Sequence, residues 1–129
     1  MKLKRVLTFA LLLPAIFCVS PAQAHTQLVG ENPKSNGKFT RLPVRVILEF
    51  NEKLQPFKSK NVNIIVVTDS HGREVDLKNT ILRGAQVIVS LRNSQEWGTF
   101  KVEYRVVSID GHPVRGSYHF YINGARKTP

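Results

Sequence analysis

Short stretches of alternating apolar and polar residues constrain the fold of this chain more than any other feature. Residues 100–106 alternate most cleanly, and residues 44–50 and 117–122 do so with few exceptions. Because successive side chains of a strand point to opposite faces, each stretch predicts a β-strand with one buried face. Residues 62–68 and 87–91 are rich in β-branched side chains, which indicates two further strands.

Turn-forming residues separate these stretches and set the number of strands. Ser70-His71-Gly72 predicts a hairpin that joins residues 62–68 to a short strand around residues 74–77. With an N-terminal strand near residues 27–29, the sequence predicts about seven short strands and no helix. This count and spacing indicate an all-β fold, an antiparallel β-sandwich of the immunoglobulin-like type. The order of the strands does not follow from alternation alone.

Residues 1–24 carry the features of a cleaved secretory signal peptide. A basic start precedes an apolar run over residues 6–19, and Ala22-Gln23-Ala24 supplies the small residues that signal peptidase requires. We expect cleavage after this motif and export to the periplasm. The mature protein would be a single domain of residues 25–129 that begins with His25.

An N-terminal His25 would carry unusual chemistry. Its α-amine and its imidazole Nδ1 can close a six-membered chelate ring on one metal ion. An α-amine has a pKa of about 8 and loses its proton far more easily than a lysine, with a pKa of about 10.4. A histidine could also stand at this position by chance, so the metal interpretation needs a second, independent signal.

Sulfur and charge exclude several classes of protein. The only cysteine, Cys18, and the only methionine, Met1, lie in the predicted signal peptide. The mature chain would therefore be no disulfide scaffold, zinc–thiolate domain or thiol enzyme, and would offer no soft metal ligand. Of the net charge of +10, three positive charges lie in the signal peptide, which leaves +7. The basic residues are scattered along the sequence, which favours a solvated basic surface over a surface that binds nucleic acid. Weak attraction to an anionic membrane or to cell-wall polymer is the alternative.

The second signal comes from the other histidines of the mature chain. His71 lies in the hairpin turn and His119 on the polar side of the last strand, so both are expected to be exposed. Asp110 and His112 are two residues apart and would project to the same side of an extended backbone. Gly111 between them also allows a tight local conformation. A carboxylate and an imidazole aimed together would supply half of a metal site, and an N-terminal His25 would supply the other half.

Four features of the sequence share a pattern with a known family. They are His25 directly after Ala-x-Ala, LEFNEKL at residues 48–54, GTFKVEYRVVSIDGH at residues 98–112 and GSYHF at residues 116–120. On these segments the sequence resembles the CopC family of periplasmic copper-binding proteins, including its small YobA-like members. The resemblance covers nearly all of the mature chain.

The resemblance implies a monomeric immunoglobulin-like or cupredoxin-like Greek-key sandwich that binds one Cu(II) at its N-terminal end. By position, His25 would supply its amine and imidazole, and His112 a second imidazole. Asp110 would supply a carboxylate oxygen, bound to the copper or hydrogen-bonded near it. Glu52 matches an acidic residue that approaches the site in some members, although a glutamate at a strand end needs no special role.

The sequence departs from the family pattern in two places. Members with a second, Cu(I) site hold it in a methionine-rich loop, and the mature chain has no methionine. The usual Thr-Pro-Ala turn is replaced by residues 32–37, a surface turn. The predicted donors, three nitrogens and a carboxylate, suit Cu(II) above the other first-row divalent ions.

Three functions remain open from the sequence. The first is a non-catalytic periplasmic protein that buffers Cu(II) or delivers it to an inner-membrane copper transporter or another periplasmic carrier. The second is a copper-dependent oxidative enzyme, because polysaccharide monooxygenases also chelate copper with an N-terminal histidine. The domain is small and has few long loops on which a substrate could dock, and an anionic Asp110 would favour Cu(II) over Cu(I). Both features argue against an oxidative enzyme. The third, a plain adhesion or assembly module, leaves the histidine pattern unexplained.

Overall fold

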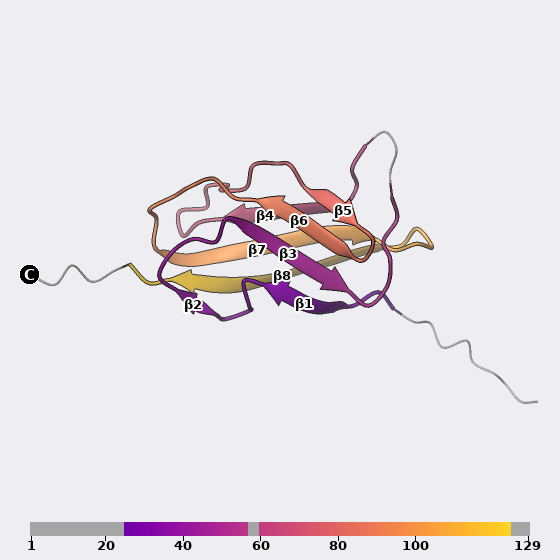
Figure 1. The fold of residues 1–129 in the computed structure, drawn as a ribbon, viewed down its shortest axis with the longest axis horizontal. Coiled ribbons are helices and arrows are strands. Elements are labelled where there is room, and N and C mark those ends of the chain that lie inside the picture. The colour runs from indigo at the N-terminus through magenta and orange to yellow at the C-terminus, as the bar shows by residue number, and fades with distance from the viewer. Residues whose placement is uncertain (1–24, 57–59, 125–129) are drawn as a thin grey trace, which may run out of the picture.

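Two β-sheets of four strands each face one another in the computed structural model, which describes residues 25–56 and 60–124 (Figure 1). The predicted signal peptide lies outside the described residues. The described residues contain no helix that is long and apolar enough to cross a membrane. In chain order the strands are β1 (Leu28–Asn32), β2 (Lys38–Phe39), β3 (Arg45–Phe50), β4 (Ile64–Thr68), β5 (Ile81–Arg83), β6 (Gln86–Ser90), β7 (Gly98–Val107) and β8 (Pro113–Ile122).

The order of the strands is β1-β3-β6-β5 in the first sheet and β2-β8-β7-β4 in the second. Neighbouring strands are antiparallel except for β2, which pairs with the end of β8 in parallel. β7 and β8 are the longest strands and form ten residue pairs, from Gly98 opposite Ile122 to Val107 opposite Pro113. This long hairpin carries its connecting turn to one end of the sandwich (Figure 1).

The predicted β-sandwich is confirmed, and the five predicted alternating or β-branched stretches form β3, β4, β6, β7 and β8. The strand expected around residues 74–77 is wrong. The turn does fold the chain back, but only isolated bridges form there, Thr68 with Glu74 and Asp76 with Leu91. β2 and β5 were not predicted, because strands of two and three residues are too short to show alternation.

The core lies between the sheets and takes one face from each strand. On β3 the inward residues Val46, Leu48 and Phe50 are buried, as the alternation predicts. The rings of Phe100 and Phe120 stack across the β7–β8 pair with their centroids 5.3 Å apart. Burial of these large apolar side chains is the main source of stability in a domain of this size.

Buried Asp76 protects the exposed edge of β4. Its carboxylate accepts a hydrogen bond from the backbone N–H of Val67 at 2.9 Å and from that of Lys78 at 3.2 Å. The hydroxyl of Thr80 likewise accepts from the backbone N–H of Ile65 at 3.3 Å. Free N–H groups on an edge strand invite pairing with other chains, so these side chains occupy positions that a neighbouring strand would otherwise take.

Asp76→Ala is expected to lower the free energy of unfolding by about 2 kcal/mol, because it leaves a buried backbone N–H without an acceptor. Asp76→Asn keeps one acceptor oxygen for Val67 and should lose less than half of that. Chemical denaturation of the mature protein measures both variants. Equal losses for the two would mean that the hydrogen bond to Val67 is not what stabilises this edge.

Tyr118 has a buried hydroxyl with no hydrogen-bond partner among the described residues. Burial, helped by the nearby charge of Glu31, raises the pKa of this tyrosine well above its ordinary value. A polar group buried without a partner costs free energy that the folded state must offset.

Tyr118→Phe should therefore increase the free energy of unfolding by about 1 kcal/mol, since it removes the unpaired hydroxyl and keeps the ring. Tyr121→Phe is the matched control, because Tyr121 lies on the outer face of the same strand and should change stability by less than about 0.5 kcal/mol. A destabilised Tyr118→Phe variant in a denaturation curve would show that the hydroxyl has a partner.

Candidate metal centre

A pocket of about 260 Å³ lies at the end of the sandwich where β3 ends and β7 turns into β8. Its lining includes His25, Glu52, Asp110 and His112, the four residues that the sequence singles out as candidate metal ligands. They come from three segments far apart in the sequence, which meet at the right-hand end of Figure 1. The fold therefore places all four residues around one pocket.

Asn51 holds the segment that contains His25 against the end of β3. Its side-chain oxygen accepts from the backbone N–H of Gln27 at 2.9 Å, and its side-chain nitrogen donates to the carbonyl of His25 at 3.1 Å. Its own backbone N–H donates to the carbonyl of Gln27 at 3.0 Å. Sequence reasoning missed this role, although Asn51 lies within the LEFNEKL motif.

A tight turn between β7 and β8 positions Asp110 and His112. The backbone N–H of Gly111 donates to the carbonyl of Ser108 at 2.9 Å, and that of Ser108 donates to the carbonyl of His112 at 2.9 Å. Gly111 has a φ of 91°, a conformation that side-chain-bearing residues rarely adopt. Of the two conformations that the sequence allows, the extended backbone and the tight one at Gly111, the structure has the tight turn.

The side chains of Asp110 and His112 contact each other directly. Nδ1 of the histidine lies 2.9 Å from Oδ2 of the aspartate, and the two side chains are 76% and 64% exposed respectively. One imidazole nitrogen thus faces a carboxylate while the side chain as a whole stays accessible to a ligand. Histidines that bind metals commonly have this arrangement, since a carboxylate partner fixes the orientation of the ring.

Ser108 holds the Asp110 carboxylate in place with a hydrogen bond. The buried Ser108 hydroxyl donates to Oδ1 of Asp110, and the backbone N–H of His112 donates to the same oxygen at 3.3 Å. The hydrogen bond from the Ser108 side chain lowers the pKa of Asp110 most, followed by the hydrogen bonds from the side chain and the backbone of His112. Together they bring this pKa to about 2. Asp110 is thus a positioned anion at neutral pH. Ser108 is a second residue that sequence reasoning missed.

Glu52 faces the pocket from the end of β3 and is tied to the N-terminal segment. The hydroxyl of Thr26, which is buried, donates to Oε1 of Glu52. The carboxylate therefore lies beside the residue that follows His25. This contact gives Glu52 a structural role at the pocket whether or not it approaches a metal.

Within residues 25–56 and 60–124, no group of three histidine or acidic side chains is close enough together to hold a metal ion. The donor set predicted for the mature protein is incomplete in the uncleaved chain, where the nitrogen of His25 forms the peptide bond to Ala24. The pocket supplies two imidazoles and two carboxylates, nitrogen and oxygen donors without sulfur. Copper is among the metals that bind imidazole nitrogen.

The two remaining histidines lie away from this pocket and are exposed, as expected. Nδ1 of His71, in the turn after β4, lies 3.9 Å from Oε2 of Glu96. His119 lies on the outer face of β8, opposite Lys101 of β7.

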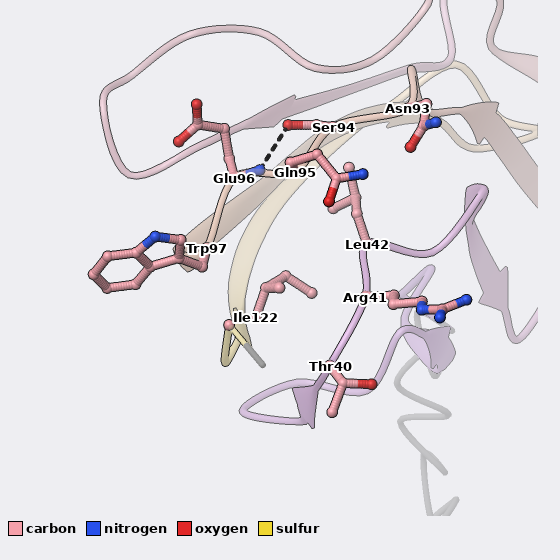
Figure 2. Close-up of a pocket in the computed structure, with 10 residues that line it drawn as sticks. Thr40, Arg41, Leu42, Asn93, Ser94, Gln95, Glu96, Trp97 and Ile122 are labelled. Carbon is pink, nitrogen blue, oxygen red and sulfur yellow. Dashed lines mark hydrogen bonds between the residues drawn. The ribbon is translucent and has the colours of Figure 1, made fainter. Parts of the chain in front are cut away.

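A second cavity, of about 490 Å³, lies at the opposite end of the sandwich, where β7 begins and β8 ends (Figure 2). Leu42 and Ile122 form apolar parts of its lining, and Trp97, which is 68% exposed, stands at its margin. No histidine lines this cavity, and its one acidic residue, Glu96, forms an ion pair with Arg73 at 2.9 Å. It therefore offers no alternative metal site.

Comparison with known proteins places this chain among copper proteins. The family model of the CopC domain matches residues 28–123. The chain is 32% identical over 124 residues to protein YobA of Escherichia coli (strain K12), covering 91% of this chain and 89% of YobA. It is 29% identical over 125 residues to copper resistance protein C of Xanthomonas campestris pv. juglandis, covering 92% and 96% of the two chains.

A longer relative contains a similar region. The chain is 30% identical over 118 residues to the copper transport protein CutJ of Bacillus subtilis (strain 168). The match covers 89% of this chain but only 21% of CutJ.

Solved structures show the same fold. CopC from Methylosinus trichosporium OB3b aligns with a TM-score of 0.69 at 24% identity, covering 81% of this chain and 100% of that structure. PcoC, a methionine-rich copper resistance protein from Escherichia coli, aligns with a TM-score of 0.61 at 24% identity, covering 78% and 100%. These likenesses agree with the two-sheet sandwich, and the family match over residues 28–123 together with the identity to YobA shows that the chain belongs to the CopC family.

Proposed function

We propose that the mature protein, residues 25–129, is a non-catalytic periplasmic protein that binds one Cu(II) and buffers or delivers it. The observation that carries the proposal is the single pocket lined by His25, Asp110 and His112, residues from opposite ends of the mature chain. Relatives named as copper resistance and copper transport proteins support copper as the cargo.

In this proposal each residue of the pocket has a distinct part. Removal of the signal peptide frees the α-amine of His25, which binds Cu(II) together with the imidazole of the same residue. Asp110 accepts a hydrogen bond from Nδ1 of His112, at the 2.9 Å separation of the two atoms, and so leaves Nε2 of His112 to bind the metal. The anionic Asp110 also favours a divalent ion over a monovalent one at this end of the molecule.

The donor chemistry selects the oxidation state. Cu(I) prefers thiolate and thioether ligands, and the mature chain contains neither cysteine nor methionine. Amine and imidazole nitrogens suit Cu(II). They must lose their protons to bind it, so affinity should fall as the pH is lowered.

The proposed recipient of the copper is an inner-membrane copper transporter or another periplasmic carrier. CutJ supports a link to transport, because a region similar to this chain forms part of a longer copper transport protein. The oxidative-enzyme alternative gains no support from the relatives. With ascorbate and oxygen, the copper-loaded protein should leave polysaccharides uncleaved, whereas oxidised oligosaccharide products would favour the enzyme.

The proposal is tested by metal titration of protein that intact-mass analysis shows to begin at His25. Electron paramagnetic resonance should show one tightly bound Cu(II) per chain with nitrogen ligands. A parallel Cu(I) titration against a competing chelator should show no comparable binding. Failure to bind Cu(II), or tight Cu(I) binding at a separate place, would refute the proposal.

A further inference from the structure

Positive charge gathers on the outer face of the second sheet. Strand pairing places Lys38, Lys101, Arg105 and Arg115 on this face, with Glu103 as the one acidic residue of the strands there among the described residues. Glu103 is already paired with Lys101, with the nitrogen and oxygen 2.5 Å apart. Basic residues that are scattered along the sequence therefore share one face of the folded sheet, because strand pairing places three strands side by side.

The first sheet does not share this concentration of charge. The charged residues on its outer face are Arg45, Glu49 and Arg83, and Glu49 lies in the same register row as Arg83, with Gln86 between them. The two faces of the sandwich therefore differ in their net charge. The first sheet offers a matched surface for control variants.

Arg105 and Arg115 lie directly opposite each other on β7 and β8. Side chains in this position start about 5 Å apart, and like charges there are unfavourable. Neither guanidinium forms an ion pair with a described residue; the contact that Arg105 makes is a long hydrogen bond of 3.4 Å to the carbonyl of Val62. Two adjacent arginines without a carboxylate partner can together hold an oxyanion with paired hydrogen bonds.

A groove of about 530 Å³ runs beside these arginines. Ile64, which is 43% exposed, and Val66 form an apolar side on β4, while Arg105 and Arg115 line it from β7 and β8. Glu103 and Tyr104 of β7 and Gly116 and Ser117 of β8 complete the lining. The carboxylate of Glu103 is the one that pairs with Lys101. A groove with one apolar and one cationic side fits a chain segment that carries both apolar and acidic side chains.

The groove lies close to the candidate metal centre. Two residue pairs, Val106 with Val114 and Val107 with Pro113, separate the arginine pair from the turn that carries His112. This corresponds to about 7 Å along the strands. Pro113 and Val114 line the metal pocket, and Arg115, which lines the groove, follows them directly in the chain.

We propose that this groove, lined by Ile64, Val66, Arg105 and Arg115, is the docking site for an acidic segment of a partner protein that exchanges copper with the adjacent pocket. The link to copper rests on the proposed function, whereas docking itself does not require the metal. An acidic protein segment fits better than a bilayer, because the paired arginines lie beside the apolar side chains of β4 and so match a segment that carries both acidic and apolar residues. An anionic membrane would instead engage the exposed lysines across the whole face.

The test is an NMR titration of the metal-free mature protein with three probes at low salt. The probes are a peptide of alternating glutamate and leucine, inorganic phosphate, and vesicles of phosphatidylglycerol and phosphatidylcholine. The peptide should shift the amide signals of Arg105, Arg115 and Ser117. Arg115→Gln should weaken peptide binding by about two- to fivefold, and the double variant with Arg105→Gln by about tenfold.

Arg45→Gln, on the outer face of the first sheet, is the control and should bind the peptide as the wild type does. Cu(II) affinity should be unchanged in Arg115→Gln, so a failure of the docking site and a failure of the metal site remain distinguishable. The proposal is overturned if the peptide signals map elsewhere, if Arg115→Gln and Arg45→Gln behave alike, or if phosphate or vesicles bind in an Arg115-dependent way and the peptide does not bind.

Discussion

His112→Ala is expected to bind Cu(II) at least about 100-fold more weakly than the wild-type mature protein. In the proposed site this substitution removes one of two imidazole ligands and leaves Asp110 without the ring that it contacts at 2.9 Å. Loss of a group that only orients a ligand typically costs 10–100-fold in metal affinity, so loss of a ligand should cost at least about the upper end of that range.

Competition with a chelator of known affinity measures this loss. His119→Ala is the matched control, because His119 is also an exposed histidine of the same hairpin but lies on the outer face of β8, opposite Lys101. It should bind Cu(II) as tightly as the wild type. Equal losses in the two variants would show that the assignment of the second imidazole is wrong.

The strands that the sequence predicts are those long enough to show a pattern. β7 is ten residues long and alternates over residues 100–106, and its inward positions, such as Phe100 and Val102, are buried as expected. The expected strand around residues 74–77 fails because Val75 is buried while Asp76 turns its carboxylate to the backbone of β4. When a side chain takes the hydrogen-bonding place of a neighbouring strand, the sequence shows no alternating pattern that would reveal it.

The site shows a similar division. The candidate ligands His25 and His112 could be predicted because metal chemistry requires particular residue types. Asn51 and Ser108, which position them, could not, because their contacts depend on hydrogen bonds across the fold. The arginine pair on β7 and β8 is likewise invisible until the register of the two strands is known.

The free amine of His25 is the central claim of this account, because it distinguishes the proposed site from an ordinary pair of histidines. One alanine added ahead of His25 converts the amine into a peptide nitrogen, which lacks a readily available lone pair. Every side chain stays in the protein, and the hydrogen bonds of Asn51 to Gln27 and to the carbonyl of His25 can still form. The chelate ring is lost together with one nitrogen ligand.

The most direct test is therefore the Cu(II) affinity of this extended protein beside that of the protein that begins at His25, measured by chelator competition at the same pH. We expect the extension to weaken binding by at least about 100-fold, with the unfolding curve unchanged. Equal affinity of the two proteins for Cu(II) would contradict the account.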